Sequence, residues 1–436
     1  MRLATYAITQ DREYKQAMLV LAEQYRASKP LPISASGLSD GAIEAFLVEA
    51  LREVKSLSNA SRLVFVKDES EGRSLAAFLS AEGENACYFP ARDLVFLNIT
   101  SSHDTERERL SVLCRLLAGE SLTVVTTPFA ALLRTPPPDA LRENCVSLRV
   151  SDEISPALLA ERLVRMGFAP VDLVESAGQF AKRGGIFDVY AAGMELPVRL
   201  EFFGDEIDRI EYFDPISQRV TAPCDCLSLC PARESLWDAE QRKAMIAAHR
   251  ALLAKADGEA FSTLHGELAV LEGEGDIPFA DRYMALLYPE CASLLSYLGE
   301  ERTVIFFVGE GGTRERVSQA LKALAKTGDS IVSRGLLAPR YHAFFSAESV
   351  LDEFLSRHIP FYITGFGGDY HGALAGLFGF RTRRTVSYFG KESLLCEDIE
   401  TLISGYYRTV VLCENENEAD AVYQMLTDRG AQGTAT

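Results

Sequence analysis

The chain has 436 residues, of which 47% are hydrophobic and 24% charged, and its formal net charge is -18. This length and composition exclude a disordered chain and are typical of a folded protein with several hydrophobic cores. A surface with this excess of acidic groups repels the phosphate backbone on average, which argues against broad unspecific DNA binding.

The cysteines and the apolar runs bear on the compartment of the protein. Nine scattered cysteines, an odd number in a long chain, indicate reduced thiols rather than a disulfide framework. The longest apolar runs, such as residues 304–308, are too short to span a bilayer. The sequence therefore predicts a cytoplasmic protein without a membrane partner.

The first third of the chain has the pattern of an α/β domain. Residues 1–30 carry charges and Ala/Leu at helical spacing and predict a leader helix. Over residues 31–132, apolar strand-like runs alternate with helical patterns, as is typical of a parallel sheet covered by helices. Pro136–Pro138 interrupt this pattern, because successive prolines fit neither a helix interior nor a central strand. We expect a domain junction there.

The remaining segments predict an inserted domain and a return to the first one. Residues 133–220 contain one helical pattern and short alternating strands, which are typical of a small α+β domain with an antiparallel hairpin sheet. Residues 221–345 return to longer helices and a strand, as expected for the second segment of the interrupted α/β domain. A connector over 346–384 and a partial C-terminal βα unit over 385–436 complete the expected organisation.

A strand, a turn of small residues and a helix start at residues 31–41 stand where a phosphate-binding loop would lie. Such a loop needs a Lys for the outer phosphates and a hydroxyl for magnesium. Asp40 occupies the Lys position and Gly41 the hydroxyl position, so the sequence favours a capped structural turn over an ATP site. The residues of this degenerate loop are Ser34, Ser36, Gly37, Ser39, Asp40 and Gly41.

Two further segments are weaker candidates. Glu310 follows a strand where an ATPase would place a catalytic Glu, but the magnesium-binding Asp is missing upstream, which favours a loop residue. Clustered glycines after the strand at 360–364 favour a connector, with a small-molecule enzyme site as the alternative. That alternative predicts a deep pocket lined by the glycines. They are Gly365, Gly367, Gly368, Gly372, Gly376 and Gly379.

Metal and hydrolase motifs do not emerge from the sequence. The spacing of Cys224, Cys226 and Cys230 does not match the common zinc pairs, and cysteines at alternating strand positions are ordinary. The six histidines form no HExxH motif, and no G-x-S-x-G turn exists. The sequence predicts no catalytic residue, no metal and no cofactor.

The strongest motif lies in the small domain. Arg183 and Arg199 stand on two strands expected to pair, where both can face one side of the sheet together with an aromatic residue. Arginines and aromatic residues dominate interface hot spots. The alternative is a solvated face, in which the arginines pair with acidic neighbours. Those neighbours are Glu201, Asp205 and Glu206.

Three runs of this domain, RGGIFDVY, RLEFFGDEID and FDPISQR, resemble the second domain shared by the excision-repair protein UvrB and the transcription-repair coupling factors (Mfd). The flanking segments over 103–133 and 276–308 are similar to the same proteins. UvrB has an intact phosphate loop and a tyrosine-rich hairpin, whereas here Asp40 replaces the Lys and only Tyr88 precedes Pro90. The resemblance is therefore to the amino-terminal region of the coupling factors.

This resemblance implies a fold, a partner and a role. The implied fold is α/β: a degenerate UvrB-like P-loop domain in two segments, an inserted UvrA-binding domain, and the truncated start of a third domain at 385–436. The implied role is an adaptor that recruits UvrA to stalled RNA polymerase, without ATPase activity, while RNA polymerase and DNA are reached only through the full-length protein. The UvrA-binding residues implied are Arg183, Arg199 and Phe203. The alternative is a UvrB-like ATP-binding repair subunit.

Overall fold

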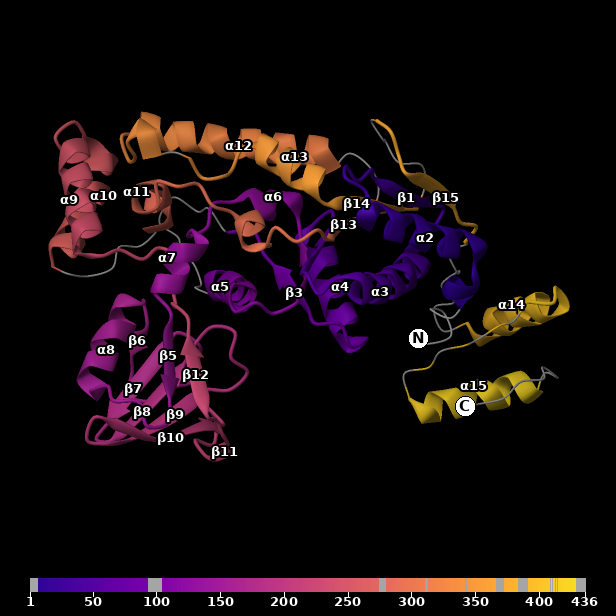
Figure 1. The fold of residues 1–436 in the computed structure, drawn as a ribbon, viewed down its shortest axis with the longest axis horizontal. Helices are drawn as coiled ribbons and strands as arrows, with labels where there is room; N and C mark the ends of the chain where they lie inside the picture. The colour runs from indigo at the N-terminus through magenta and orange to yellow at the C-terminus, as the bar shows by residue number, and fades with distance from the viewer. Residues whose placement is uncertain are drawn as a thin grey trace.

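The computed structural model describes residues 7–92, 104–273, 280–309, 313–341, 343–365, 372–382, 391–407 and 415–428, and the single residues 409, 411 and 413. Figure 1 shows a large body built on a twisted sheet, a smaller β-rich domain that projects from one side of it, and two helices near the C-terminus at the far end. Within these residues, no helix is both long and apolar enough to cross a membrane.

A seven-stranded sheet forms the body, in the order β15-β1-β14-β13-β2-β4-β3. All of its strand pairs are parallel. Its central strands are short apolar runs buried on both faces, which is the burial that a parallel sheet covered by helices requires. The strands are β1 (Ile33–Ser36), β2 (Arg62–Phe65), β3 (Ala86–Phe89), β4 (Thr123–Thr126), β13 (Val304–Val308), β14 (Ile359–Thr364) and β15 (Gly376–Gly379). The predicted α/β class with a parallel sheet is confirmed.

Helices cover both faces of this sheet, and the alternation of side chains along β2 separates two cores. Val64 faces a core shared with α2 (Arg12–Arg26), α3 (Asp40–Leu57) and α4 (Glu69–Ala81). Phe65 faces a second core, built with α5 (Asp104–Leu117), α6 (Pro128–Leu132), the first half of α12 (Thr313–Ser333) and α13 (Glu348–Arg357). The predicted leader helix thus contributes α2 to the first core.

The sheet also extends past the expected boundary at residue 345. The segment predicted as a connector, 346–384, contains α13 and two strands of the sheet, and β14 lies between β1 and β13. The apolar run of β14 is long enough to form a buried strand, but its neighbours lie far away in the sequence. Sequence periodicity carries no information about such distant pairing.

The projecting domain is built on a six-stranded sheet in the order β11-β10-β9-β8-β7-β6, with α8 (Pro156–Arg165) packed on one face. Its strands are β6 (Ala169–Pro170), β7 (Gln179–Arg183), β8 (Ile186–Tyr190), β9 (Val198–Phe203), β10 (Glu206–Phe213) and β11 (Val220–Pro223). The chain enters through β5 (Val146–Arg149) and leaves through β12 (Cys226–Leu229), which pair antiparallel. The predicted antiparallel hairpin sheet is confirmed, and it continues past the expected end at residue 220.

The other described elements are helical. The α9–α10 hairpin packs beside α11 and the second half of α12, around Met245, Leu264 and Tyr283. Where the partial βα unit is predicted, the structure has α14 and α15. Of the strand expected at 408–413, residues 408, 410 and 412 lie outside the described residues, and 409, 411 and 413 are not assigned to a strand. These elements are α7 (Pro138–Glu143), α9 (Ala239–Leu253), α10 (Gly258–Glu272), η1 (Ala280–Tyr283), α11 (Met284–Leu287), η2 (Leu294–Tyr297), η3 (Pro339–Tyr341), α14 (Glu392–Ser404) and α15 (Glu416–Asp428).

A buried histidine makes the stability of this body depend on pH. His358 ends α13, and its Nδ1 accepts the backbone N–H of Thr303 at 3.2 Å. Burial, followed by the charges of Arg357 and Arg302, lowers the pKa of His358 to about 4 from its ordinary 6.5. Between these two pH values the unfolded chain binds more protons at this histidine than the folded chain does. The contribution of the neutral His358 to the free energy of unfolding is therefore complete above pH 6.5 and decreases as the pH falls toward 4.

We therefore expect the melting temperature to drop between about pH 6.5 and pH 4, and the variant His358→Asn to remove part of this drop. The amide oxygen of Asn can accept the Thr303 N–H but does not titrate. Thermal unfolding followed by circular dichroism at each pH measures both curves. Curves that fall in parallel would show that His358 carries none of the pH dependence.

Candidate functional site

The degenerate phosphate loop is closed by the protein itself. Gly37 has a φ of 82°, and a Cβ at this position would lie 2.1 Å from the carbonyl oxygen of Phe380. The backbone amides of the turn already have protein acceptors. Gly37 N–H donates to Gly365 O at 3.0 Å, Leu38 N–H to Thr364 O at 3.4 Å and Ser39 N–H to Thr382 Oγ1 at 2.6 Å. These amides are the groups that a phosphate-binding loop would direct at its ligand.

The glycine-rich segment is part of this closure. Gly376 and Gly379 bound β15, the edge strand that pairs with β1. A Cβ on Gly376 would lie 2.7 Å from the ring of Phe378, so the glycine makes room for that side chain. Two candidate sites from the sequence thus pack against each other. Glu310, Gly367, Gly368 and the side chain of Asp40 lie outside the described residues.

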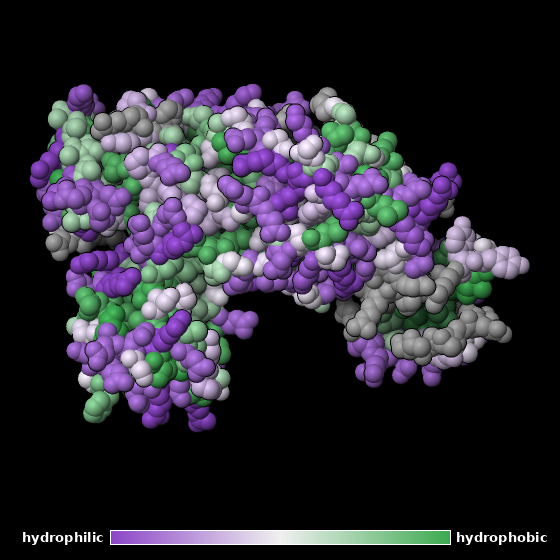
Figure 2. All heavy atoms as spheres, in the orientation of Figure 1, coloured by the Kyte–Doolittle hydropathy of each residue, from purple (hydrophilic) through white to green (hydrophobic). Residues whose placement is uncertain are grey.

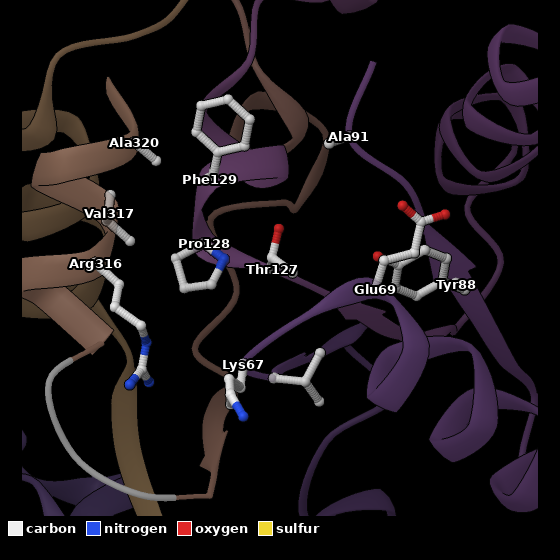
Figure 3. Close-up of a pocket in the computed structure, with 11 residues that line it drawn as sticks. Lys67, Glu69, Tyr88, Ala91, Thr127, Pro128, Phe129, Arg316, Val317 and Ala320 are labelled. Carbon is white, nitrogen blue, oxygen red and sulfur yellow. The ribbon is translucent and has the colours of Figure 1, made fainter. Parts of the chain in front are cut away.

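A pocket of about 280 Å³ lies elsewhere, at the carboxyl ends of β2, β3 and β4 and beside α12 (Figure 3). Lys67 and Arg316 bring positive charge to it, and most of the other lining side chains are apolar. The lining residues are Val66, Lys67, Glu69, Tyr88, Ala91, Thr127, Pro128, Phe129, Arg316, Val317 and Ala320. This pocket includes neither the degenerate loop nor the Gly365–Gly379 segment, so it lends no support to an enzyme site built on those glycines.

The three clustered cysteines of the sequence do not converge. The Cys224 thiol donates to the backbone oxygen of Cys226 at 2.8 Å, and Cys226 itself is exposed. Cys230 lies instead beside Cys145, with 3.6 Å between the two sulfur atoms. In the part of the chain that the structure describes, no group of three His, Cys, Asp or Glu side chains is arranged to hold a metal ion.

The strand register of the small domain gathers the predicted arginines on one face. Phe187 and Leu200 point into the core beneath α8. Asp188 and Arg199 are directly paired across β8 and β9, and successive residues of a strand alternate between faces, so both lie on the opposite face. Arg183 pairs with Ile186, two residues before Asp188, and shares that face. The sheet thus presents a surface away from α8, which we call the open face.

Asp188 is the centre of the open face. Its side chain is fully buried, and Arg199 binds it with two hydrogen bonds, Nε to Oδ1 at 2.7 Å and Nη2 to Oδ2 at 2.9 Å. Arg183 adds a third, from Nη2 to Oδ2 at 2.7 Å. A buried carboxylate is stable only when its charge is compensated, and two guanidinium groups do this here. The sequence alternative, pairing with Glu201, Asp205 or Glu206, therefore missed the acidic partner that both arginines share.

Contacts with Phe213 and Gln218 also hold the Arg199 guanidinium in place. Its guanidinium lies 4.7 Å from the centre of the Phe213 ring, and its Nη1 donates to the backbone oxygen of Gln218 at 3.3 Å. Gln218 has a φ of 60°, a conformation that costs a non-glycine residue free energy. Its side-chain amide donates to Pro215 O at 2.7 Å and to Val174 O at 3.3 Å, and these bonds fix the strained turn.

The three predicted contact residues differ in their access to a partner. The Phe203 residue is 83% exposed, at the end of β9. The side chain of Arg183 is 47% exposed, whereas that of Arg199 is only 15% exposed. Phe203 and Arg183 are therefore available at the surface, and Arg199 is mainly internal. Figure 2 shows the mixed polar and hydrophobic surface of this domain.

Comparison with known proteins agrees with this geometry. Residues 146–234, from the start of β5 to just beyond β12, match the family model of the UvrB interaction domain. The chain is also 26% identical to the transcription-repair-coupling factor of Bacillus subtilis, over 81% of this chain and 31% of the relative. The chain is thus similar to the transcription-repair-coupling factors over most of its length. The resemblance seen in the sequence is confirmed.

Other coupling factors give the same result. The protein of Myxococcus xanthus is 35% identical over 42% of this chain and 16% of its own length. The protein of Staphylococcus epidermidis is 21% identical over 98% of this chain and 36% of its own length. The chain thus spans about a third, or less, of the curated relatives it matches. The matched interaction domain ends at residue 234, beyond the expected boundary at 220.

The buried ion pair of the open face gives a stability prediction. Replacing Asp188 by Asn keeps the shape of the side chain but removes the charge that compensates Arg199. We expect the free energy of unfolding to fall by about 3 kcal/mol, as is typical when one partner of a buried pair is removed. Urea unfolding followed by fluorescence measures the change.

The matched control is Asp208→Asn on β10, which lies two strands away from β8 in the same sheet. Asp208 is 56% exposed and lies 3.3 Å from Arg209, so this variant should change the unfolding free energy by less than about 1 kcal/mol. Equal effects of the two substitutions would contradict a special role of Asp188.

Proposed function

We propose that this chain is the adaptor region of a transcription-repair-coupling factor and that its small domain recruits UvrA to stalled RNA polymerase in transcription-coupled nucleotide excision repair. The match of residues 146–234 to the UvrB interaction domain supports this role. Contacts with RNA polymerase and DNA, and any ATP-driven movement, belong to other parts of such a factor in this proposal. In this proposal the protein acts in the cytoplasm.

One observation carries the proposal: an exposed aromatic residue and a half-exposed arginine lie on the same face of the matched domain. Residues 199, 201 and 203 share one face of β9, and that face also carries Arg183 two strands away. Ile186, between them, is 37% exposed and extends the apolar part of the surface. An apolar anchor beside a guanidinium group is the usual composition of an interface hot spot.

The three predicted residues take different roles in this proposal. Phe203 inserts into an apolar pocket of UvrA, and the exposed part of the Arg183 guanidinium binds an acidic group there. Arg199 is a positioning residue, because its two hydrogen bonds fix the Asp188 carboxylate to which Arg183 is anchored. The partner therefore meets a preformed site, which lowers the entropy cost of binding.

Binding of purified UvrA to the chain, measured by calorimetry, tests this division. We expect Phe203→Ala and Arg183→Ala each to weaken binding by about 30-fold, the effect of losing about 2 kcal/mol at a hot spot. Phe203 is exposed and free of the Asp188 ion pairs, so its variant should melt within about a degree of the parent. Arg183→Ala removes one hydrogen bond to the buried Asp188 carboxylate, so it should also lower the melting temperature, but by less than Arg199→Ala, which removes two. Arg199→Ala should weaken binding and lower the melting temperature together.

Two exposed residues away from the open face provide matched controls. Ile216 is 93% exposed in the turn between β10 and β11, and Arg165 on α8 has a side chain that is 74% exposed. Replacing either by Ala should leave UvrA affinity unchanged. Parent-like affinity in both the Phe203 and Arg183 variants would refute the proposed surface, and a parent chain without affinity for UvrA would refute the adaptor role.

We further propose that the degenerate loop binds no nucleotide. The hydrogen bonds of its amides to Gly365, Thr364 and Thr382 support this, since ATP would have to displace all three. A thermal-shift titration with millimolar Mg-ATP should leave the melting temperature unchanged. A rise in melting temperature that depends on ATP concentration would contradict this proposal and favour the alternative of a UvrB-like ATP-binding subunit.

A further inference from the structure

Two cysteines face each other where the small domain joins the body. In the two-stranded ladder of β5 and β12, Val146 is paired with Leu229. The next pair outward is Cys145 and Cys230, whose sulfur atoms lie 3.6 Å apart. Directly opposite residues of an antiparallel pair hold their Cβ atoms about 4.5–5.5 Å apart, close to the range that a disulfide spans. Only a small movement separates these thiols from bonding distance.

A third thiol and two arginines set the ionisation of this pair. Hydrogen bonding with Cys114 on α5 and with Cys230, aided by the charges of Arg142 and Arg162, lowers the pKa of Cys145 to about 4. The bonds that Cys114 makes to the other two thiols, together with burial, raise its own pKa. The pKa of Cys230 is lowered by Cys114 but raised more by Cys145 and burial. Cys145 thus has the lowest pKa of the three thiols and is partly exposed, so it is the thiol that most readily forms a thiolate.

We propose that Cys145 and Cys230 are an oxidation site, a dithiol that peroxide converts into a disulfide at the base of the small domain. The Cys145 thiolate attacks one peroxide oxygen and the O–O bond breaks. The expelled hydroxide takes up the proton that the Cys145 thiol had released, so the products are a sulfenic acid on Cys145 and one water. Cys230 then attacks the Cys145 sulfur, the S–O bond breaks and a second water leaves. Two thiols and one hydrogen peroxide give one disulfide and two waters.

The position of the bridge determines its consequence. Cys145 precedes β5 and Cys230 follows β12, so the bond joins the two chain crossings between body and small domain. It encloses α8 and β6–β11 in one covalent loop, which restricts the unfolded chain and raises stability. The pairing of Asp188 with Arg199, within that loop, is unaffected. Oxidation would therefore lock the small domain onto its base without altering the open face.

Exposed cysteines elsewhere serve as internal controls. Cys291 is exposed, and its sulfur contacts oxygen atoms, Phe345 O at 3.7 Å and Ser346 Oγ at 3.6 Å. Cys226 is also exposed and stands opposite Arg149 in the same ladder. Exposure alone would favour oxidation of these two thiols, whereas the proposal favours Cys145 and Cys230.

The test is a thiol count on the whole chain after treatment with hydrogen peroxide. Free thiols, titrated with Ellman's reagent in denaturant, should fall by two from the nine of the reduced chain. Non-reducing peptide mapping should recover one cross-link, Cys145 to Cys230, and dithiothreitol should reverse it. The oxidised chain should melt at a higher temperature than the reduced chain.

Single variants identify the pair. Cys145→Ser and Cys230→Ser should each prevent the loss of two thiols, whereas Cys114→Ser and Cys291→Ser should still lose two. A bridge containing Cys114, oxidation confined to Cys226 or Cys291, or accumulation of sulfinic acid on Cys145 without a bridge would each overturn the proposal. The peptide map of the unsubstituted chain decides between these outcomes even where a variant folds poorly.

Discussion

The large domain depends on pairing between strands that lie at opposite ends of the chain. Both neighbours of β1, β14 and β15, come more than three hundred residues later. The same segments supply the acceptors for the amides of the turn after β1. The segments that complete the sheet therefore also close the degenerate phosphate loop. A nucleotide would have to displace hydrogen bonds that belong to the fold.

The strands that follow the inserted domain pair with β1 and β2, which precede it. The chain therefore leaves the body into the inserted domain and comes back to the body at one place. The β5–β12 ladder brings the two ends of the inserted domain together. Just beyond it, the buried Glu234 binds Arg109 of α5, Nε to Oε1 at 2.6 Å, and that guanidinium lies over Phe89. Apolar packing, a buried ion pair and the Cys145–Cys230 pair thus converge on this junction.

The open face combines a rigid interior with an accessible exterior. Burying the Asp188 carboxylate costs free energy, and the ion pairs with Arg183 and Arg199 offset this cost. These ion pairs fix the positions of the three side chains on the open face. Phe203 and the outer part of Arg183 remain exposed at its edge. A surface of this kind is suited to binding a protein partner, because its charged group is held in place before contact.

The sequence by itself determined the local elements: the β/α alternation, the hairpin strands, the missing Lys at Asp40, and the motif that carries Arg183, Arg199 and Phe203. These depend on residue type and short-range periodicity. Only the tertiary structure decided that Asp188 joins both arginines, that β15 closes the loop after β1, and that Cys145 meets Cys230. Each of these depends on strand register or long-range pairing, which spacing along the chain does not encode.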